Sequence, residues 1–238
     1  MSNLDCKYLD IPSADGSAVR AYMARPVGRG VLPVLLVLQE AFGVNAHIRQ
    51  VAERFAAGLG YLAIAPELFH RTAPGIEGDY NDFTGVMEHV RALTEEGMSA
   101  DFTGVYNWIR GQEAVDCEMV GAVGFCMGGR AAFLCNSVLP LKAAVSYYGG
   151  GIAPGLLGRA PAMQGPILLF WGGMDQHIGP EQRRAVSDAL CDAGKKYVAV
   201  EFSDAQHGFF CDVRPSYNPD AAIQSWALTV EFFKAYLK

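Results

Sequence analysis

The stretch VGFCMGG occupies residues 123–129, where it follows an apolar run and opens a helical pattern over Arg130–Val138. Its G-x-C-x-G pattern is the thiol version of a nucleophile elbow, a strained strand-to-helix turn that presents a reactive side chain. Gly124 and Gly128 remove the side chains that would collide at such a turn. A helix that begins immediately after Cys126 directs its partial positive end at the thiol, which favours a thiolate and a developing oxyanion. The stretch therefore predicts a nucleophilic Cys126. For this motif on its own, the alternative is a glycine-rich turn with an incidental buried cysteine.

On either side of this stretch, short apolar runs alternate with amphipathic helical patterns. The apolar runs predict strands at Lys7–Ile11, Ala18–Ala24, Val34–Gln39, Leu62–Ala65, Met119–Phe125, Ala143–Tyr148, Ile167–Trp171 and Tyr197–Phe202. The other helical patterns cover Ile48–Leu59, Ala100–Arg110, Pro180–Ala193 and Ala222–Leu237. Runs that are apolar throughout are typical of a parallel sheet covered on both faces, and the alternation favours an α/β fold.

The predicted organisation is a single domain over residues 1–238. We expect a mostly parallel central sheet of about seven to eight strands with helices on both faces, opened by an antiparallel hairpin around Asp15 and Gly16. The polar segment at about 69–98 does not follow this alternation of apolar runs and helical patterns. We interpret it as a small cap-like insertion over the sheet, with an ordinary long surface connection as the alternative.

Two further polar residues follow strands in the order that a catalytic triad requires. Asp175 comes after the run Ile167–Trp171, and His207 comes after Tyr197–Phe202. Because the carboxyl ends of parallel strands share one edge of the sheet, we expect both residues to lie beside Cys126. The sequence thus predicts a Cys-His-Asp triad. His177 lies too close to Asp175 in the chain to serve as its partner and also reach the cysteine.

The loop after Val34–Gln39 offers the second half of an oxyanion hole. In such a hole one N–H comes from the residue after the nucleophile, here Met127, and one comes from this loop, where Ala41 is the natural choice. Glu40 is unusual there because a carboxylate repels developing negative charge. It is interpreted either as a solvated or helix-capping acid, or as a second acid/base and partner of the thiol.

Composition excludes several classes of protein. The chain has 238 residues, 51% of them hydrophobic and 18% charged, with a net charge of −6. This balance argues against disorder and against nucleic-acid or anionic membrane surfaces as partners. The six cysteines form no CxxC pair and no His/Cys spacing suggests a metal, so we expect a reduced, cytoplasmic protein without metal or cofactor. The expected assembly is a monomer or small homo-oligomer.

Five short motifs together resemble the dienelactone hydrolase family. They are QEAFGVN at 39–45, APELF at 65–69, GFCMGG at 124–129, YYG at 147–149 and HGF at 207–209. The similarity runs in order over nearly the whole chain, and QEAFGVN is much more specific than the elbow. The resemblance implies an α/β-hydrolase fold with a triad of Cys126, His207 and Asp175, and a Glu40 that contacts the cysteine. It also implies carboxymethylenebutenolidase-type chemistry, the opening of an unsaturated lactone or small ester through a thioester.

The sequence departs from this family at a residue that would bind the carboxylate of the substrate. Dienelactone-specific members carry an arginine four residues after the catalytic histidine, where this chain has Cys211. Arg71, Arg91 or Arg214 could substitute, but we expect neutral lactones and aryl esters to be turned over at least as well as carboxylated ones. The predicted pocket residues are Phe42, Trp171, Phe209, Arg71 and Arg91. The alternatives are a carboxylesterase acting on an unrelated small ester and a non-catalytic protein that uses a reactive thiol for binding or redox sensing.

Overall fold

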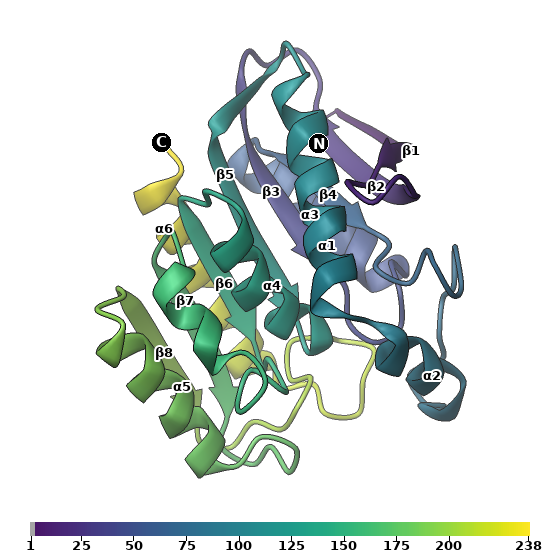
Figure 1. Ribbon diagram of the computed structural model, residues 1–238. Coiled ribbons are helices and arrows are strands. Elements are labelled where there is room, and N and C mark those ends of the chain that lie inside the picture. The colour runs from purple at the N-terminus through teal and green to yellow at the C-terminus, as the bar shows by residue number, and fades with distance from the viewer. Residues whose placement is uncertain (1–2) are drawn as a thin grey trace.

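In the computed structural model, which describes residues 3–238, one eight-stranded sheet forms the centre of the molecule (Figure 1). Its strands are β1 (Leu4–Pro12), β2 (Ala18–Pro26), β3 (Leu32–Leu38), β4 (Leu62–Pro66), β5 (Val115–Phe125), β6 (Ala143–Tyr147), β7 (Ile167–Gly172) and β8 (Tyr197–Phe202). The order across the sheet is β1-β2-β4-β3-β5-β6-β7-β8. The strands from β4 to β8 in this order pair in parallel, whereas β1 pairs antiparallel with β2, and β2 with β4. The predicted mostly parallel sheet is confirmed.

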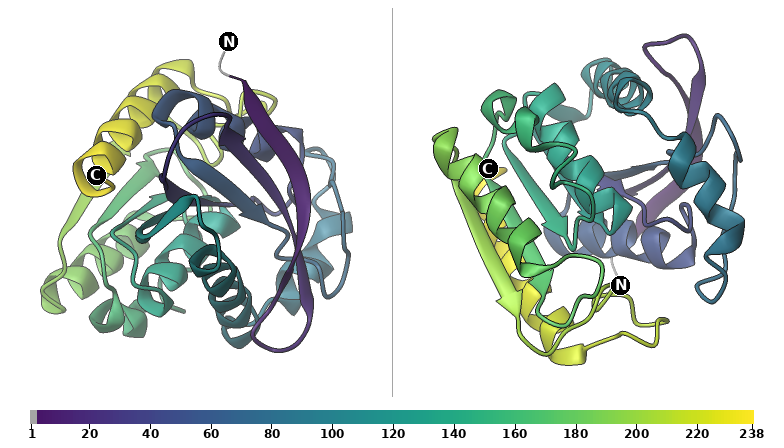
Figure 2. Two further views of the ribbon diagram at one scale, coloured as in Figure 1. Left: turned by 90° about the horizontal axis from the view of Figure 1, so that it is seen from above. Right: turned by 60° about the horizontal axis from the view of Figure 1, so that its bottom comes forward.

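Helices cover both faces of this sheet. They are α1 (Ala46–Leu59), α2 (Thr84–Ala92), α3 (Glu95–Arg110), α4 (Met127–Val138), α5 (Pro180–Asp192) and α6 (Pro219–Tyr236), with a 3-10 helix at Leu157–Ala162. Figure 2 shows α1 and α6 on one face and α3, α4 and α5 on the other. The rings of Phe55 in α1 and Trp226 in α6 pack at 4.5 Å, which joins the two helices of the first face. None of the helices within residues 3–238 has the length and apolar character needed to cross a membrane.

Helix capping explains where the observed helices depart from the apolar patterns. The predicted helix Ala100–Arg110 begins five residues earlier, at Glu95, because the Thr94 side chain accepts a hydrogen bond from the Gly97 N–H. The acidic Glu95 and Glu96 also lie in the first turn, where the helix dipole favours them. Such polar first turns carry no apolar periodicity, so the pattern alone places the start too late.

The segment predicted as a cap-like insertion lies over the loop that follows β3. It contains α2, and its last residues belong to α3. The Gly78 N–H donates to the Phe42 carbonyl at 3.0 Å, and the buried side chain of Val86 packs with Phe42 and Ala41. The segment therefore places side chains such as Tyr80 beside the carboxyl end of the sheet.

Candidate active site

Cys126 occupies a strained turn between β5 and α4. Its φ of 56° and ψ of −118° lie in a region that L-residues rarely adopt. The turn is possible because Gly124 and Gly128 bring backbones together: a Cβ on Gly124 would overlap the Gly128 carbonyl, and one on Gly128 would overlap the Leu38 carbonyl of β3. The same contact presses the start of α4 against the end of β3. It therefore brings the two proposed oxyanion donors, the N–H groups of Met127 and Ala41, onto neighbouring segments.

One histidine connects Cys126 with a buried carboxylate. The His207 Nε2 lies 3.0 Å from the Cys126 sulfur, and its Nδ1 lies 2.8 Å from the Asp175 Oδ2. The side chain of His207 is only 11% exposed. Burial opposes its charged form, but the Cys126 sulfur and the Asp175 carboxylate outweigh burial and raise the pKa of His207 to about 10. The imidazole therefore holds its proton at neutral pH.

Asp175 is fixed by the loop that follows β7. Its Oδ1 accepts hydrogen bonds from the backbone N–H groups of His177 at 2.8 Å and Ile178 at 3.2 Å, which leaves Oδ2 for His207. Burial would raise the pKa of this carboxyl, yet the bonds from His207 and the two backbone groups hold it below its usual value. The ring of His177 packs edge-on against that of His207 at 5.3 Å. His177 thus contributes its backbone N–H to the carboxylate and its ring to the wall.

Glu40 is fully buried and held by two partners. Its Oε1 accepts from Arg214 at 3.0 Å, and its Oε2 accepts from the Tyr80 hydroxyl at 3.1 Å. Tyr80 in turn accepts from the Asn45 amide at 2.9 Å. Burial opposes the charged form of Arg214, but Glu40 and the Cys126 sulfur hold its pKa above the usual value. The resemblance implied a Glu40 that contacts Cys126; here both carboxylate oxygens are engaged by other residues.

Tyr148 lies behind the histidine and carries an unpaired hydroxyl. Its side chain is fully buried, and its ring centre lies 5.1 Å from that of His207. The hydroxyl finds no hydrogen-bond partner within residues 3–238. Burial and the nearby carboxylate of Glu40 raise its pKa well above the usual value, so Tyr148 offers a neutral O–H donor at the site.

A cavity with polar walls lies beside these groups. It has a volume of about 470 Å³, and its walls include His207, His177, Tyr80 and Arg214. The sequence could not place Arg214, because this residue comes from the long loop after His207, where no periodicity applies. Arg214, which the sequence offered only as one possible replacement for the missing arginine, therefore brings a cation to this cavity.

The five predicted pocket residues lie in different parts of the structure. Phe42 lies beside the Glu40 pair, with its ring 5.7 Å from the Arg214 guanidinium carbon. Phe209 is fully buried against Tyr148, beneath the site rather than in its wall. Its aromatic character therefore serves packing.

The other three lie elsewhere. Trp171 lines a different cavity, beside α5. The Arg71 guanidinium is bound by Asp15 and Asp101, and Arg91 is exposed near the end of α2. None of these three residues lines the cavity beside His207. For Arg71 the reason is its pairing with Asp15 and Asp101, which no motif reveals.

Comparison with known proteins shows to which family this chain belongs. A model of the dienelactone hydrolase family matches residues 19–237. The chain belongs to the dienelactone hydrolase family. It is 37% identical to a protein of Synechocystis sp. named "Putative carboxymethylenebutenolidase", over 92% of this chain and 93% of that protein. A protein of the same name from Escherichia coli is also 37% identical, over 96% of this chain and 86% of its own length.

A solved structure agrees with this assignment. The crystal structure of a "Putative Dienelactone Hydrolase" from Klebsiella pneumoniae has a TM-score of 0.88 and 32% identity, over 98% of this chain and 100% of the other. The protein is therefore a hydrolase of the dienelactone hydrolase family with the α/β-hydrolase fold, as the sequence motifs predicted.

Proposed function

We propose that this hydrolase opens a lactone or small ester through a thioester on Cys126. The observation that carries the proposal is the position of His207, which lies within hydrogen-bond distance of both the Cys126 sulfur and the Asp175 carboxylate. That arrangement is the one nucleophilic catalysis requires, with a base at the nucleophile and a third group that orients the base.

In the proposed reaction, the Cys126 sulfur attacks the carbonyl carbon and the carbonyl oxygen becomes an oxyanion. The N–H groups of Met127 and Ala41 donate to this oxygen. When the tetrahedral intermediate collapses, the C–O bond breaks, and His207 gives its proton to the leaving alkoxide or enolate. His207 then takes a proton from water as the water attacks the thioester, and the carboxylic acid leaves as the thiol is restored.

The first test is the loss of the nucleophile. We expect Cys126→Ala to retain the fold and to lose more than 99% of the turnover of an aryl acetate and an unsaturated lactone, by an order-of-magnitude estimate from covalent catalysis. The matched control is Cys191→Ala, which removes an exposed thiol and should leave turnover unchanged. Mass spectrometry of quenched wild-type reactions should find the acyl group on Cys126.

The outcomes separate the competing functions. If Cys126→Ala still turns over these substrates, a residue other than Cys126 is the nucleophile. A wild-type chain that hydrolyses no ester while Cys126 oxidises readily would favour the reactive-thiol protein. Turnover of aryl esters without any lactone would favour a carboxylesterase.

Arg214 favours a more specific substrate, one with a carboxylate. Arg214 lines the cavity beside His207, and an anion in a partly desolvated pocket needs a cationic partner. We expect a carboxylated lactone to be preferred over its methyl ester in wild type, and Arg214→Gln to lower kcat/KM for the acid about tenfold more than for the ester, worth roughly 1.4 kcal/mol. An equal effect on both substrates would contradict a carboxylate-binding role and support the original expectation of neutral substrates.

A further inference from the structure

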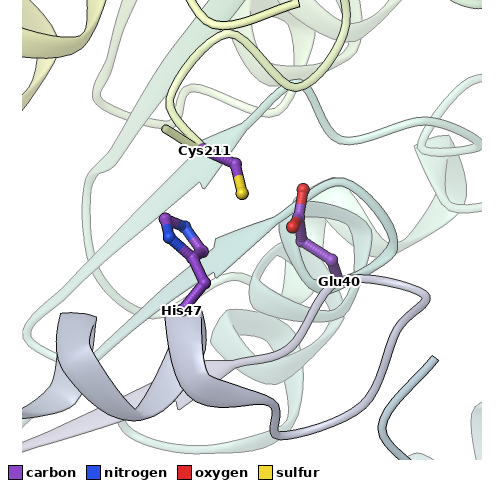
Figure 3. A group of neighbouring side chains, drawn as sticks. All are labelled: Glu40, His47 and Cys211. Carbon is purple, nitrogen blue, oxygen red and sulfur yellow. The ribbon is translucent and has the colours of Figure 1, made fainter. Parts of the chain in front are cut away.

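A second cluster of potential ligand groups contains Glu40 but not Cys126. Glu40, His47 and Cys211 are all buried, and the atoms with which they could bind a metal lie within 4.8 Å of one another. Figure 3 shows the three side chains converging from the loop after β3, the first turn of α1 and the loop after β8. The fold therefore brings a carboxylate, an imidazole and a thiol to one place from distant parts of the chain.

The imidazole of His47 has one nitrogen without a partner. Its side chain is only 7% exposed, and Nε2 makes no hydrogen bond within residues 3–238. The other nitrogen, Nδ1, lies 3.6 Å from the Asp212 carboxylate. Histidines that bind metals have this environment, with a carboxylate near one nitrogen and a free lone pair on the other. Burial, the largest influence, lowers the pKa of His47.

We propose that Glu40, His47 and Cys211 form a binding site for a divalent cation of the zinc class. Oxygen, nitrogen and sulfur donors together suit Zn²⁺ better than Mg²⁺ or Ca²⁺, which take oxygen ligands. Ligand atoms around a tetrahedral zinc lie roughly 3–4 Å apart, so small side-chain movements complete the site. Water supplies the fourth ligand.

Binding changes the protonation of the thiol and involves no redox step. Burial, with Glu40 nearby, raises the pKa of Cys211 to about 12, so the thiol keeps its proton in the absence of a cation. When the sulfur–metal bond forms, the S–H bond breaks and the proton passes to solvent. His47 lines a surface cavity of about 210 Å³ together with Asp212 and Arg54, which gives the ion a path from solvent.

Arg214 competes with the cation. Its guanidinium lies 3.0 Å from the Glu40 carboxylate and neutralises it. A metal at Glu40 must share or displace this partner, so affinity for the metal and the strength of the Glu40–Arg214 pair are opposed. This competition distinguishes the site from an adventitious thiol ligand elsewhere on the chain.

The test is a titration of the chelator-treated chain with Co²⁺ under anaerobic conditions. We expect one equivalent to produce a sulfur-to-cobalt charge-transfer band in the near ultraviolet, with about one proton released per ion, and Zn²⁺ to bleach the band. The band should persist in Cys126→Ser and in the control Cys191→Ser, and it should vanish in Cys211→Ser.

Two variants outside the ligand set sharpen the result. Asp212→Asn changes a side chain that is 62% exposed, and it should weaken Co²⁺ binding about 10- to 100-fold. It keeps the test decisive if the buried Cys211→Ser fails to fold. Arg214→Gln should tighten binding about tenfold or more, because it leaves Glu40 without its counter-charge.

The proposal is overturned if no one-equivalent band appears in wild type. It is equally overturned if the band is lost in Cys126→Ser and kept in Cys211→Ser, since the ion then sits at the Cys126–His207 pair. An Asp212→Asn variant with wild-type affinity would also overturn it. Because the readout is absorbance rather than turnover, these outcomes are independent of the proposed hydrolysis.

Discussion

Replacing Glu40 by Gln should destabilise the protein far more than a surface charge change does. Glu40 is fully buried, and its partner Arg214, 3.0 Å away, is 11% exposed. Gln keeps the shape and can still accept from Tyr80, but it leaves a buried guanidinium that cannot lose its proton. At 3 Å and an effective dielectric of about 20 the lost attraction is about 5 kcal/mol. Because breaking one side of a buried pair costs about 3–5 kcal/mol, we expect Glu40→Gln to lower the free energy of unfolding by about 3 kcal/mol.

The reverse substitution, Arg214→Met, should also destabilise the protein, because it leaves the buried carboxylate of Glu40 without its cation. The cost of Glu40→Gln should be the same at pH 7 and pH 5, because the orphaned arginine stays charged throughout this range.

Urea unfolding of wild type, both single variants and the double variant, at pH 7 and pH 5, measures these differences. The double variant should recover most of the loss, since it leaves no unpaired charge. A cost below about 1 kcal/mol for Glu40→Gln, the typical value of an exposed ion pair, would refute the reasoning. So would losses that simply add in the double variant.

Three further predictions concern the turn and the histidine. His207→Ala should remove nearly all ester hydrolysis in steady-state assays, whereas His177→Ala should lower kcat/KM less than about tenfold; the reverse result would reassign the base. In Cys126→Ser the pKa of His207 should fall from about 10, since the Cys126 sulfur that raises it is lost, and an NMR titration of the ring protons that finds no change would contradict the contact. Gly124→Ala should cost at least about 3 kcal/mol in urea unfolding because its Cβ overlaps backbone, whereas the control Gly158→Ala, with nothing within 4 Å, should stay within about 1 kcal/mol; equal costs would show that the turn does not require glycine.

The parts of the site that lie next to strands were predictable from sequence. Cys126, Asp175 and His207 each follow a strand of the parallel part of the sheet, and such strands deliver their carboxyl ends to one edge. Topology therefore brings these residues together whatever the loops do in detail. The apolar strand patterns likewise predicted the fold and the position of the elbow. The elbow needs glycine at 124 and 128 because a Cβ at either position would overlap backbone atoms.

The parts that depend on loops were not predictable. Arg214 reaches Glu40 from the loop between β8 and α6, and Tyr80 reaches it from the inserted segment. The cluster with His47 and Cys211 joins residues whose spacing matches no metal motif. Loop conformations depend on tertiary contacts rather than on periodicity. From residue type alone, Arg71 and Arg214 were therefore equally good candidates for binding a substrate carboxylate.

The pairing of Glu40 with Arg214 resolves an objection that the sequence raised. A carboxylate beside an oxyanion hole opposes the negative charge that develops when a carbonyl is attacked. Here the guanidinium lies 3.0 Å from that carboxylate, so the pair carries no net charge, and Arg214 is also one of the residues that line the cavity beside His207. In the proposed mechanism the loop can therefore carry Glu40 next to the donor Ala41 without raising the barrier. If the proposed substrate carboxylate or the proposed cation draws the arginine away from Glu40, the charge of this carboxylate is no longer balanced at the site.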